Sequence, residues 1–245
     1  MSDVYAAMDL ELNTESSNKR EYFDLIEVGL VIYENGTFNI LEKYQSYVKT
    51  KKAPIFERIT ELTGITQDII DEKGKDFLTV YAEMVDIVKK YKVKKIYTWG
   101  DYDEVALGKN CKMYPIVPDK HTILRKIEDY AAIMEKLLRI RGLSLEEAVY
   151  IYNADKDDIS RHHALDDAML VYYIAKALND GCDGKRVERV RNFIKIRDMY
   201  NSLRGKFRQN KEITEKSNLS AEKLWDMINR DEDFFDFENF IRNCE

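Results

Sequence analysis

The stretch Val4-Tyr5-Ala6-Ala7-Met8-Asp9-Leu10-Glu11 places two carboxylates at the end of a mostly apolar run. Side chains alternate between the two faces of a β-strand, so a strand here directs Asp9 and Glu11 to one face and Leu10 to the other. Two anions this close repel each other, and partial burial makes the ionised form of each more costly. A cation between them relieves both penalties, and ligands that are all oxygen favour Mg²⁺ or Mn²⁺ over zinc. Taken alone, the stretch fits a surface strand with two acids at least as well.

The residues that follow predict an antiparallel meander. Residues 24–33 form a β-rich run, and residues 38–48 form a strand that pairs back onto it. Between them, Asn35-Gly36 is the commonest two-residue hairpin turn, because both residues tolerate positive φ. The chain therefore opens with three antiparallel strands.

Helices and one strand alternate in the middle of the chain. Val93 to Thr98 is the expected strand, and it ends at Trp99-Gly100. Helices are expected at residues 58–71, 76–91, 101 onward, 127–140, 144 onward (a capping box at Ser144) and 161–178. This alternation indicates an α/β fold with a site at the carboxyl end of the strands.

Length and composition fit one sizeable domain with an appendage. The 245 residues are 44% hydrophobic, which is enough for a packed core. No apolar run has the length of a membrane span, and Met1-Ser2-Asp3 lacks the basic start of a signal peptide, so we expect a cytoplasmic protein without membrane contact. The net charge of −6 gives no general attraction for nucleic acid, so binding a polyanion would depend on metal ions and local basic patches.

Three blocks of sequence share a pattern of acids and a histidine. They are Asp9-Leu10-Glu11, Trp99-Gly100-Asp101-Tyr102-Asp103 and His162-His163-Ala164-Leu165-Asp166-Asp167-Ala168. In this order and at these separations they resemble the three motifs of the DEDDh family of 3′→5′ exonucleases. The second block is most similar to the branch that contains sporulation-inhibitor and histone-mRNA exonucleases. After the first motif the chain reads Leu12-Asn13-Thr14 where many relatives have Thr-Gly, a departure in the base-stacking region and not in the ligands.

The resemblance, which covers about residues 4–180, implies an RNase H-like mixed sheet flanked by helices. The sheet would combine the antiparallel three-stranded meander with parallel strands. Residues 1–180 would form the exonuclease domain and residues 181–245 a helical C-terminal extension, basic over 185–211 and acidic over 212–245. Either the apolar face of this extension packs on the domain, or its basic face also guides a nucleic-acid strand while the acidic end docks on a partner protein.

The resemblance also implies a metal-dependent hydrolysis of single-stranded RNA or DNA from the 3′ end to nucleoside monophosphates. Two Mg²⁺ or Mn²⁺ ions would lie about 3.5–4 Å apart. Asp9 would bridge the ions, Glu11 and Asp167 would complete the shell of one ion, and Asp103 would support the other. His162 would be the general base, a role suited to histidine as a residue type because its unperturbed pKa is near neutrality.

Two of these residues have close neighbours of the same type. The family spacing puts an aspartate five residues after the histidine, which selects His162 with Asp167 and leaves His163 as a helix-start residue. The Trp-Gly-Asp-x-Asp pattern points to Asp103 and not Asp101, although an acid in the first turn favours any helix.

Five apolar or aromatic residues near these motifs are candidates for contact with the substrate. They are Leu10, Leu12, Leu62, Trp99 and Tyr102, and ordinary core packing explains each of them equally well. A non-catalytic nucleic-acid or protein binding module on the same fold is the alternative function, which the complete set of acids and His162 argues against. An HD-type phosphohydrolase would need a His-Asp dipeptide, and the three histidines form none.

Overall fold

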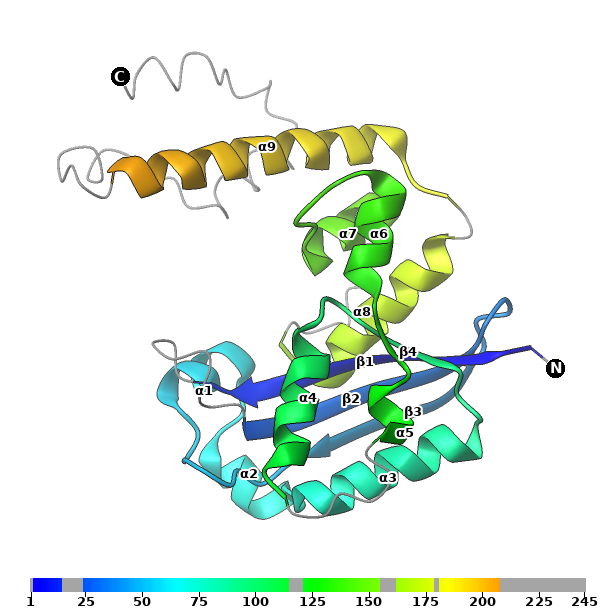
Figure 1. The fold of residues 1–245 in the computed structure, drawn as a ribbon, viewed down its shortest axis with the longest axis vertical. Coiled ribbons are helices and arrows are strands. Elements are labelled where there is room, and N and C mark those ends of the chain that lie inside the picture. Colours follow the sequence, from blue (N-terminus) through cyan, green and yellow to red (C-terminus); the bar gives the residue numbers. More distant parts are fainter. Residues whose placement is uncertain (1, 15–23, 115–120, 155–161, 179–180, 208–245) are drawn as a thin grey trace.

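A five-stranded mixed sheet forms the centre of the computed structural model, which describes residues 2–14, 24–114, 121–154, 162–178 and 181–207. Its strands are β1 (Val4–Asn13), β2 (Asp24–Glu34), β3 (Ile40–Tyr47), β4 (Lys95–Thr98) and β5 (Ile127–Asp129), in the order β3-β2-β1-β4-β5. The β1–β2 and β2–β3 pairs are antiparallel, whereas β4 pairs parallel with β1 and with β5. The predicted meander with added parallel strands is confirmed, and β1 is the central strand (Figure 1).

The turn between β2 and β3 is wider than the two-residue hairpin that the sequence predicts. Gly36 and Phe38 have positive φ values of 100° and 56°, whereas Asn35 is not among the residues with positive φ. The Phe38 ring stacks on Tyr33 at a centroid distance of 5.8 Å, and the Tyr172 hydroxyl donates to the Phe38 carbonyl at 2.6 Å. The predicted turn geometry is therefore wrong, because contacts with α8 (Ala164–Ala177) and β2 hold a longer loop.

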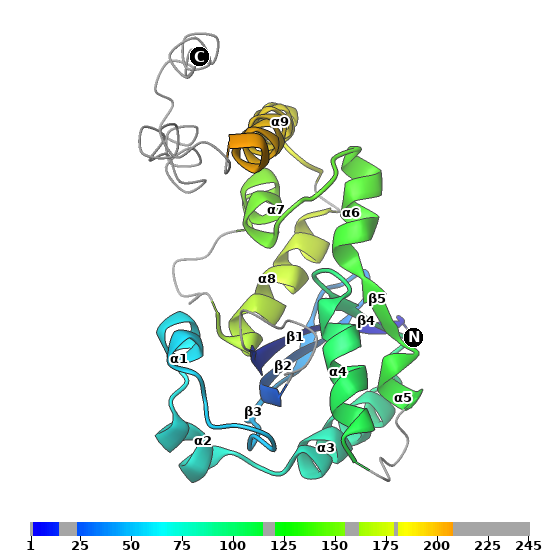
Figure 2. The same cartoon turned by 60° about the vertical axis from the view of Figure 1, so that its left-hand side comes forward.

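Helices cover both faces of the sheet (Figure 2). On one face α8 packs against β1 and β2, together with α6 (Tyr130–Leu138) and α7 (Leu145–Tyr152). The other face is covered by α3 (Phe77–Lys90), α4 (Tyr102–Lys112) and α5 (His121–Leu124). The short helices α1 (Glu57–Thr63) and α2 (Gln67–Lys73) form a small third cluster around Ile26. The helix predicted from Asp76 and the capping box at Ser144 are both confirmed.

The helix predicted for residues 127–140 begins later than expected. Ile127, Glu128 and Asp129 pair with β4 as the edge strand β5, and only then does α6 begin. The Asp129 carboxylate accepts the Ala132 N–H at 3.0 Å and so caps α6. Three residues are too few to show a strand period, so the sequence pattern missed β5 and merged it with the helix.

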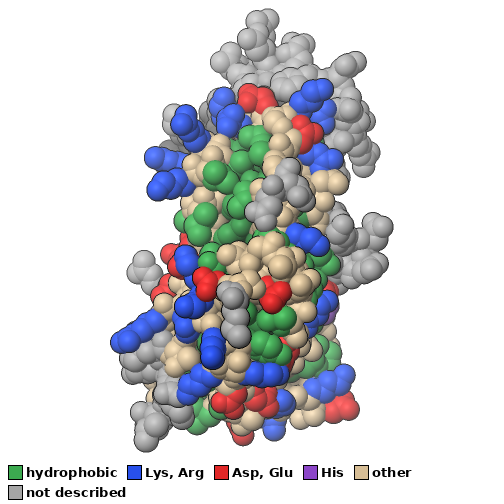
Figure 3. Space-filling view, turned by 90° about the vertical axis from the view of Figure 1, so that its right-hand side faces the viewer, with side chains coloured by type: hydrophobic (Ala, Val, Ile, Leu, Met, Phe, Trp, Pro, Cys, Tyr) green, Lys and Arg blue, Asp and Glu red, His purple; other side chains and the backbone are tan. Residues whose placement is uncertain are grey.

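The C-terminal extension is helical in its described part, α9 (Gly184–Phe207). Val187, Val190, Phe193 and Ile194 are buried in the same apolar cluster as residues of α7 and α8. Figure 3 shows lysine and arginine side chains in the upper part of the molecule, where α9 lies, and also over its lower half. The predicted acidic segment, 212–245, lies outside the described residues. Within the described ranges, no helix combines the length and the hydrophobicity needed to cross a membrane.

Candidate active site

The central strand β1 presents Asp9 and Glu11 toward α8. Ala7, two residues before Asp9, is buried in the cluster on the α8 face, whereas Met8 and Leu10 are buried on the α3 and α4 face. The period of two therefore places Asp9 and Glu11 on the α8 side, as the sequence predicts. Both acids are partly buried.

The residues that begin α8 bring the third motif to this strand. His162 is exposed and has a φ of 62°, a left-handed conformation that is uncommon outside glycine. Its backbone N–H donates to Oδ2 of Asp167 at 3.2 Å, and the Asp167 N–H donates to the carbonyl of His163 at 2.9 Å. His163 is the N-cap residue of α8. The hydrogen bond across the start of α8 thus links the histidine of the motif, which precedes the helix, to the aspartate in its first turn.

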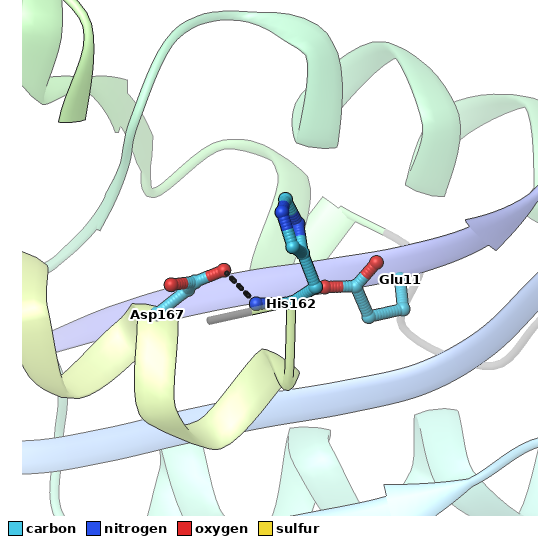
Figure 4. Close-up of side chains that lie close together, drawn as sticks. All are labelled: Glu11, His162 and Asp167. Atoms are coloured by element: carbon cyan, nitrogen blue, oxygen red, sulfur yellow. Dashed lines mark hydrogen bonds between the residues drawn. The ribbon is translucent and has the colours of Figure 1, made fainter. Parts of the chain in front are cut away.

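Glu11, His162 and Asp167 converge from these two elements. One potential ligand atom from each lies within 4.8 Å of those of the other two. Figure 4 shows the carboxylates of Glu11 and Asp167 on either side of the His162 backbone, with the imidazole ring projecting away from the line that joins them. This is the pairing of His162 with Asp167, and of both with the first motif, that the family spacing implies.

The second motif supplies a buried acid from the first turn of α4. Asp103 is 6% exposed, and its carboxylate accepts a hydrogen bond from the backbone of Leu10. Asp101, by contrast, is the exposed N-cap residue of α4 and makes no side-chain capping bond. The structure therefore directs Asp103, and not Asp101, toward β1.

The site acids raise one another's pKa. Burial, followed by the charges of Asp103, Glu11 and Asp167, raises the pKa of Asp9 well above its ordinary value. Burial and neighbouring carboxylates raise the pKa of Glu11 to about 8. Burial, with a smaller contribution from Asp167, raises the pKa of Asp103 to about 8 despite the hydrogen bond from Leu10. Among the described residues, no lysine or arginine forms an ion pair with Asp9, Glu11 or Asp103.

This donor set fits a divalent metal site. Four carboxylates and one imidazole lie around the end of β1, and among the described side chains no lysine or arginine forms an ion pair with Asp9, Glu11 or Asp103. Hard divalent cations such as Mg²⁺ and Mn²⁺ take such oxygen ligands. Bound cations would reverse the upward pKa shifts, because they favour the ionised carboxylates.

The five candidate substrate contacts divide into buried and exposed residues. Leu10 and Leu12 are 6% and 8% exposed and pack in the cluster on the face opposite to Asp9, which accounts for both. Trp99 packs beside Tyr130, and its ring N–H donates to the carbonyl of Leu143 at 3.3 Å. The two exposed candidates are Leu62 in α1 and Tyr102 in α4.

Sequence reasoning missed one acid beside the site. Glu27 of β2 lies opposite Glu11 in the antiparallel register and is 1% exposed. Its charge contributes to the raised pKa values of Asp9 and Glu11. A single acid inside an otherwise apolar strand was the available signal, since buried strands seldom carry an unpartnered carboxylate.

The model of the exonuclease family matches residues 7–175 of the 245-residue chain. The chain belongs to the exonuclease family. The resemblance to the DEDDh 3′→5′ exonucleases drawn from the three motifs is thereby confirmed. The family consists of nucleases, so membership supports nuclease activity on nucleic acid.

Solved structures of other exonucleases share this fold. They include a full-length 3′-exonuclease (TM-score 0.62, 22% identity, 74% of this chain and 62% of that chain), the nuclease domain of 3′hExo, a DEDDh family member, bound to rAMP (0.59, 22%, 74% and 94%), and E. coli exonuclease I in complex with a dT13 oligonucleotide (0.54, 16%, 73% and 41%). The chain therefore spans less than two thirds of the first of these proteins. No curated protein matches the chain by sequence.

Proposed function

We propose that this exonuclease removes nucleotides from the 3′ end of single-stranded RNA or DNA in a reaction that depends on two Mg²⁺ or Mn²⁺ ions. The observation that carries the proposal is the convergence of Glu11, His162 and Asp167 next to the partly buried Asp9 and the buried Asp103. Solved proteins with this fold that bind rAMP or an oligonucleotide support the choice of substrate.

The metal ligands in this proposal are the four acids of the motifs. Asp9, whose pKa responds to each of the other three, is assigned to both ions; Glu11 and Asp167 are assigned to one ion and Asp103 to the other. When bound, the ions supply positive charge that stabilises the attacking and leaving oxygens of the phosphodiester. Without cations the same residues repel one another. The arrangement therefore lowers the stability of the metal-free protein and favours the binding of cations.

His162 is the proposed general base. Its imidazole is exposed and within reach of the two carboxylates, so it is placed to accept a proton from a water molecule that attacks the terminal phosphate. The new bond joins the water oxygen to phosphorus, and the bond from phosphorus to the 3′ oxygen of the preceding nucleotide breaks. The departing 3′ oxygen takes up a proton from solvent and becomes the new 3′ hydroxyl, a nucleoside monophosphate leaves, and His162 returns the proton of the attacking water to solvent. The hydrogen bond from its backbone to Asp167 keeps the base beside the site.

The exposed side chains near the site are the proposed contacts to the terminal nucleotide. Leu62 is 51% exposed and Tyr102 is 44% exposed, and both lie on elements that border the acids. An aromatic ring such as that of Tyr102 can stack on a base of any sequence. Trp99 is the third candidate, while the substrate contact predicted for Leu10 and Leu12 would require the chain to expose side chains that are buried.

Digestion of oligonucleotides labelled at the 5′ end tests the proposed function. We expect a ladder of products shortened from the 3′ end on both RNA and DNA single strands, lost on addition of EDTA and restored by Mg²⁺ or Mn²⁺. An oligonucleotide bound without shortening in Mg²⁺ and in Mn²⁺ would instead indicate a binding module. Label released at once as a mononucleotide would indicate attack from the 5′ end and contradict the proposed direction.

Guidance of the strand by the basic face of the extension is a separate proposal. Of the basic residues in α9 whose exposure is described, Lys185 and Lys195 are exposed, whereas Arg186, Arg191 and Arg197 bond to the domain. Guidance predicts that Lys185→Gln and Lys195→Gln each reduce the salt slope of oligonucleotide binding by about 1. An unchanged salt slope would contradict guidance of the strand, and packing on the domain would then be the role of α9. These substitutions are preferable to truncation, which would expose the apolar residues of α7 and α8 in the cluster that α9 shares.

A further inference from the structure

Glu27 is a buried acid that the proposed chemistry does not use. It is 1% exposed, and its register partner on β1 is Glu11, so the two side chains lie on the same face of the sheet. A carboxylate at this depth needs hydrogen-bond donors, since burial of an ionised group without them is costly.

The donors that Glu27 uses come from α8 and from β3. Oε2 accepts the backbone N–H of Ala164, the first residue of α8, at 3.0 Å, and Oε1 accepts the side-chain amide of Gln45. The N-terminus of a helix has free N–H groups and a positive dipole end, so a carboxylate is favourable there. Glu27 therefore anchors the start of α8 to the sheet across 137 residues of sequence.

Gly29 of β2 allows the start of α8 to lie directly against the sheet. A Cβ atom at Gly29 would lie 2.2 Å from the carbonyl carbon and oxygen of Ala164, so the backbone of α8 rests directly on β2 at this point. Gly29 is the register partner of Asp9, which places the first turn of α8 next to the central acid. Only glycine permits this approach.

We propose that Glu27 is a positioning residue, which together with Gly29 fixes the first turn of α8 so that His162 and Asp167 meet Asp9 and Glu11. Both of its carboxylate oxygens are engaged, which distinguishes Glu27 from the acids assigned to metal. The effect reaches the reaction through the turn that carries His162 and Asp167, which are themselves joined by a hydrogen bond. In its kinetic part this proposal rests on the proposed function.

Two substitutions separate the hydrogen bond of Glu27 from its charge. Glu27→Ala removes the anchor, and we expect kcat to fall about 10²-fold with little change in KM, the size of loss that follows a displacement of about 1 Å in a catalytic group. Glu27→Gln keeps an oxygen that can accept the Ala164 N–H, but it removes the charge and replaces the oxygen that accepts from Gln45 with an amide donor. We expect activity within about fivefold of wild type, because the bond to the start of α8 is retained. Equal losses in the two variants, or a wild-type kcat in Glu27→Ala, would overturn the proposal.

Glu147→Ala is the matched control. Glu147 is likewise buried, and its carboxylate accepts the backbone N–H of Ser144 at 2.7 Å at the start of α7, away from the site. We expect this variant to lower the melting temperature and to leave kcat unchanged in assays below that temperature. A fall in kcat equal to that of Glu27→Ala would mean that any loss of helix anchoring lowers activity, and the specific role of Glu27 would be refuted.

Amide hydrogen exchange tests the anchor without reference to activity. The N–H of Ala164 should exchange faster in Glu27→Ala than in wild type, and at a near-wild-type rate in Glu27→Gln. This result with an inactive wild-type protein would refute the proposed function and retain the anchor. An active wild-type protein with unchanged Ala164 exchange in Glu27→Ala would do the reverse.

Discussion

Buried acids serve opposite purposes at two places in this molecule. At the end of β1 the site acids raise one another's pKa, and no described lysine or arginine forms an ion pair with Asp9, Glu11 or Asp103. In α7, Glu147 is 3% exposed, pairs with Arg197 at 2.8 Å and accepts the Ser144 N–H at 2.7 Å. The acids of the first group repel one another, and a bound cation would relieve that repulsion. The charge of Glu147 is already balanced by Arg197. The balance of charge around a buried acid, more than its burial, separates a functional group from a structural one.

Neutralising Asp9 should have the largest effect on turnover and is the strongest test of this contrast. Asp9→Asn removes the ligand assigned to both metals, so we expect turnover to fall at least about 10³-fold. The same change relieves repulsion in the metal-free protein, so its melting temperature should rise. Asp166→Asn, the same substitution in the first turn of α8, is the control and should stay within about threefold of wild-type turnover. Trimming by Asp9→Asn at the wild-type rate in Mg²⁺ would contradict the assignment of these acids as the active site.

Replacing the base should have the next largest effect. His162→Asn should lower kcat by about 10²–10³-fold, because asparagine cannot take up the proton. Asparagine tolerates the left-handed φ of 62° at this position, so the backbone is preserved. His163→Asn is the matched control, since asparagine is also a good N-cap residue for α8. Equal losses from the two substitutions would contradict the assignment of His162.

Much of this site could be predicted from sequence because its signals are local. Asp9 and Glu11 show the period of a strand, and His162 and Asp167 are only five residues apart at the start of one helix. Glu27 and Gly29 could not be assigned, since their partner Ala164 is more than 130 residues away and only the fold brings it close. For the same reason a helical pattern could show that α9 has an apolar face, but not what that face contacts.

The edge of the sheet and the start of α9 show a second limit of prediction from sequence. β5 has three residues and runs directly into α6, so no period identifies it. Arg186 and Arg191 look like parts of a solvated basic run, yet they donate to the carbonyls of Tyr150 and Leu138 near the C-terminal ends of α7 and α6. Such contacts combine a charge with an exposed helix terminus, which no sequence pattern records.

The pH dependence of stability should differ in sign from that of most buried ion pairs. In the folded protein burial and neighbouring carboxylates raise the pKa of Glu11 and Asp103 to about 8, whereas acids in an unfolded chain titrate near pH 4. The folded state therefore holds more protons between these values, and stability is lost as the pH rises from about 4 to about 8. We expect denaturant titrations of the metal-free protein to show this loss, about 1.4 kcal/mol for each unit by which folding raises a pKa.

Magnesium supplies the internal control for this measurement. The ion binds the ionised acids of the folded state, so it should stabilise the protein more at pH 8 than at pH 5 and flatten the profile. Asp9→Asn should also flatten it in the absence of metal. Stability that rises from pH 5 to pH 8 without metal would show that the acids do not repel one another as the structure indicates.

Loss of the ion pair between Arg197 and Glu147 of α7 should cause the smallest change in turnover and a large change in stability. Arg197→Met removes the ion pair with Glu147 and the bond to the carbonyl of Gly142, and leaves a carboxylate with 4% side-chain exposure without its cation. Breaking such a pair from one side costs about 2–4 kcal/mol, whereas kcat should not change at temperatures where the variant is folded.

The sign of the pH effect makes this last prediction specific. Burial already raises the pKa of Glu147, and the charge of Arg197 opposes that rise. Loss of the arginine should raise the pKa further, so Arg197→Met should be less destabilised at pH 5, where Glu147 is closer to protonated, than at pH 8. Adding Glu147→Gln to Arg197→Met removes the titrating group, and the destabilisation of this double variant should no longer change with pH. A loss of stability in Arg197→Met that is equal at both pH values would assign the arginine's contribution to its packing and its bond to Gly142, and the charge contrast with the active site would then fail.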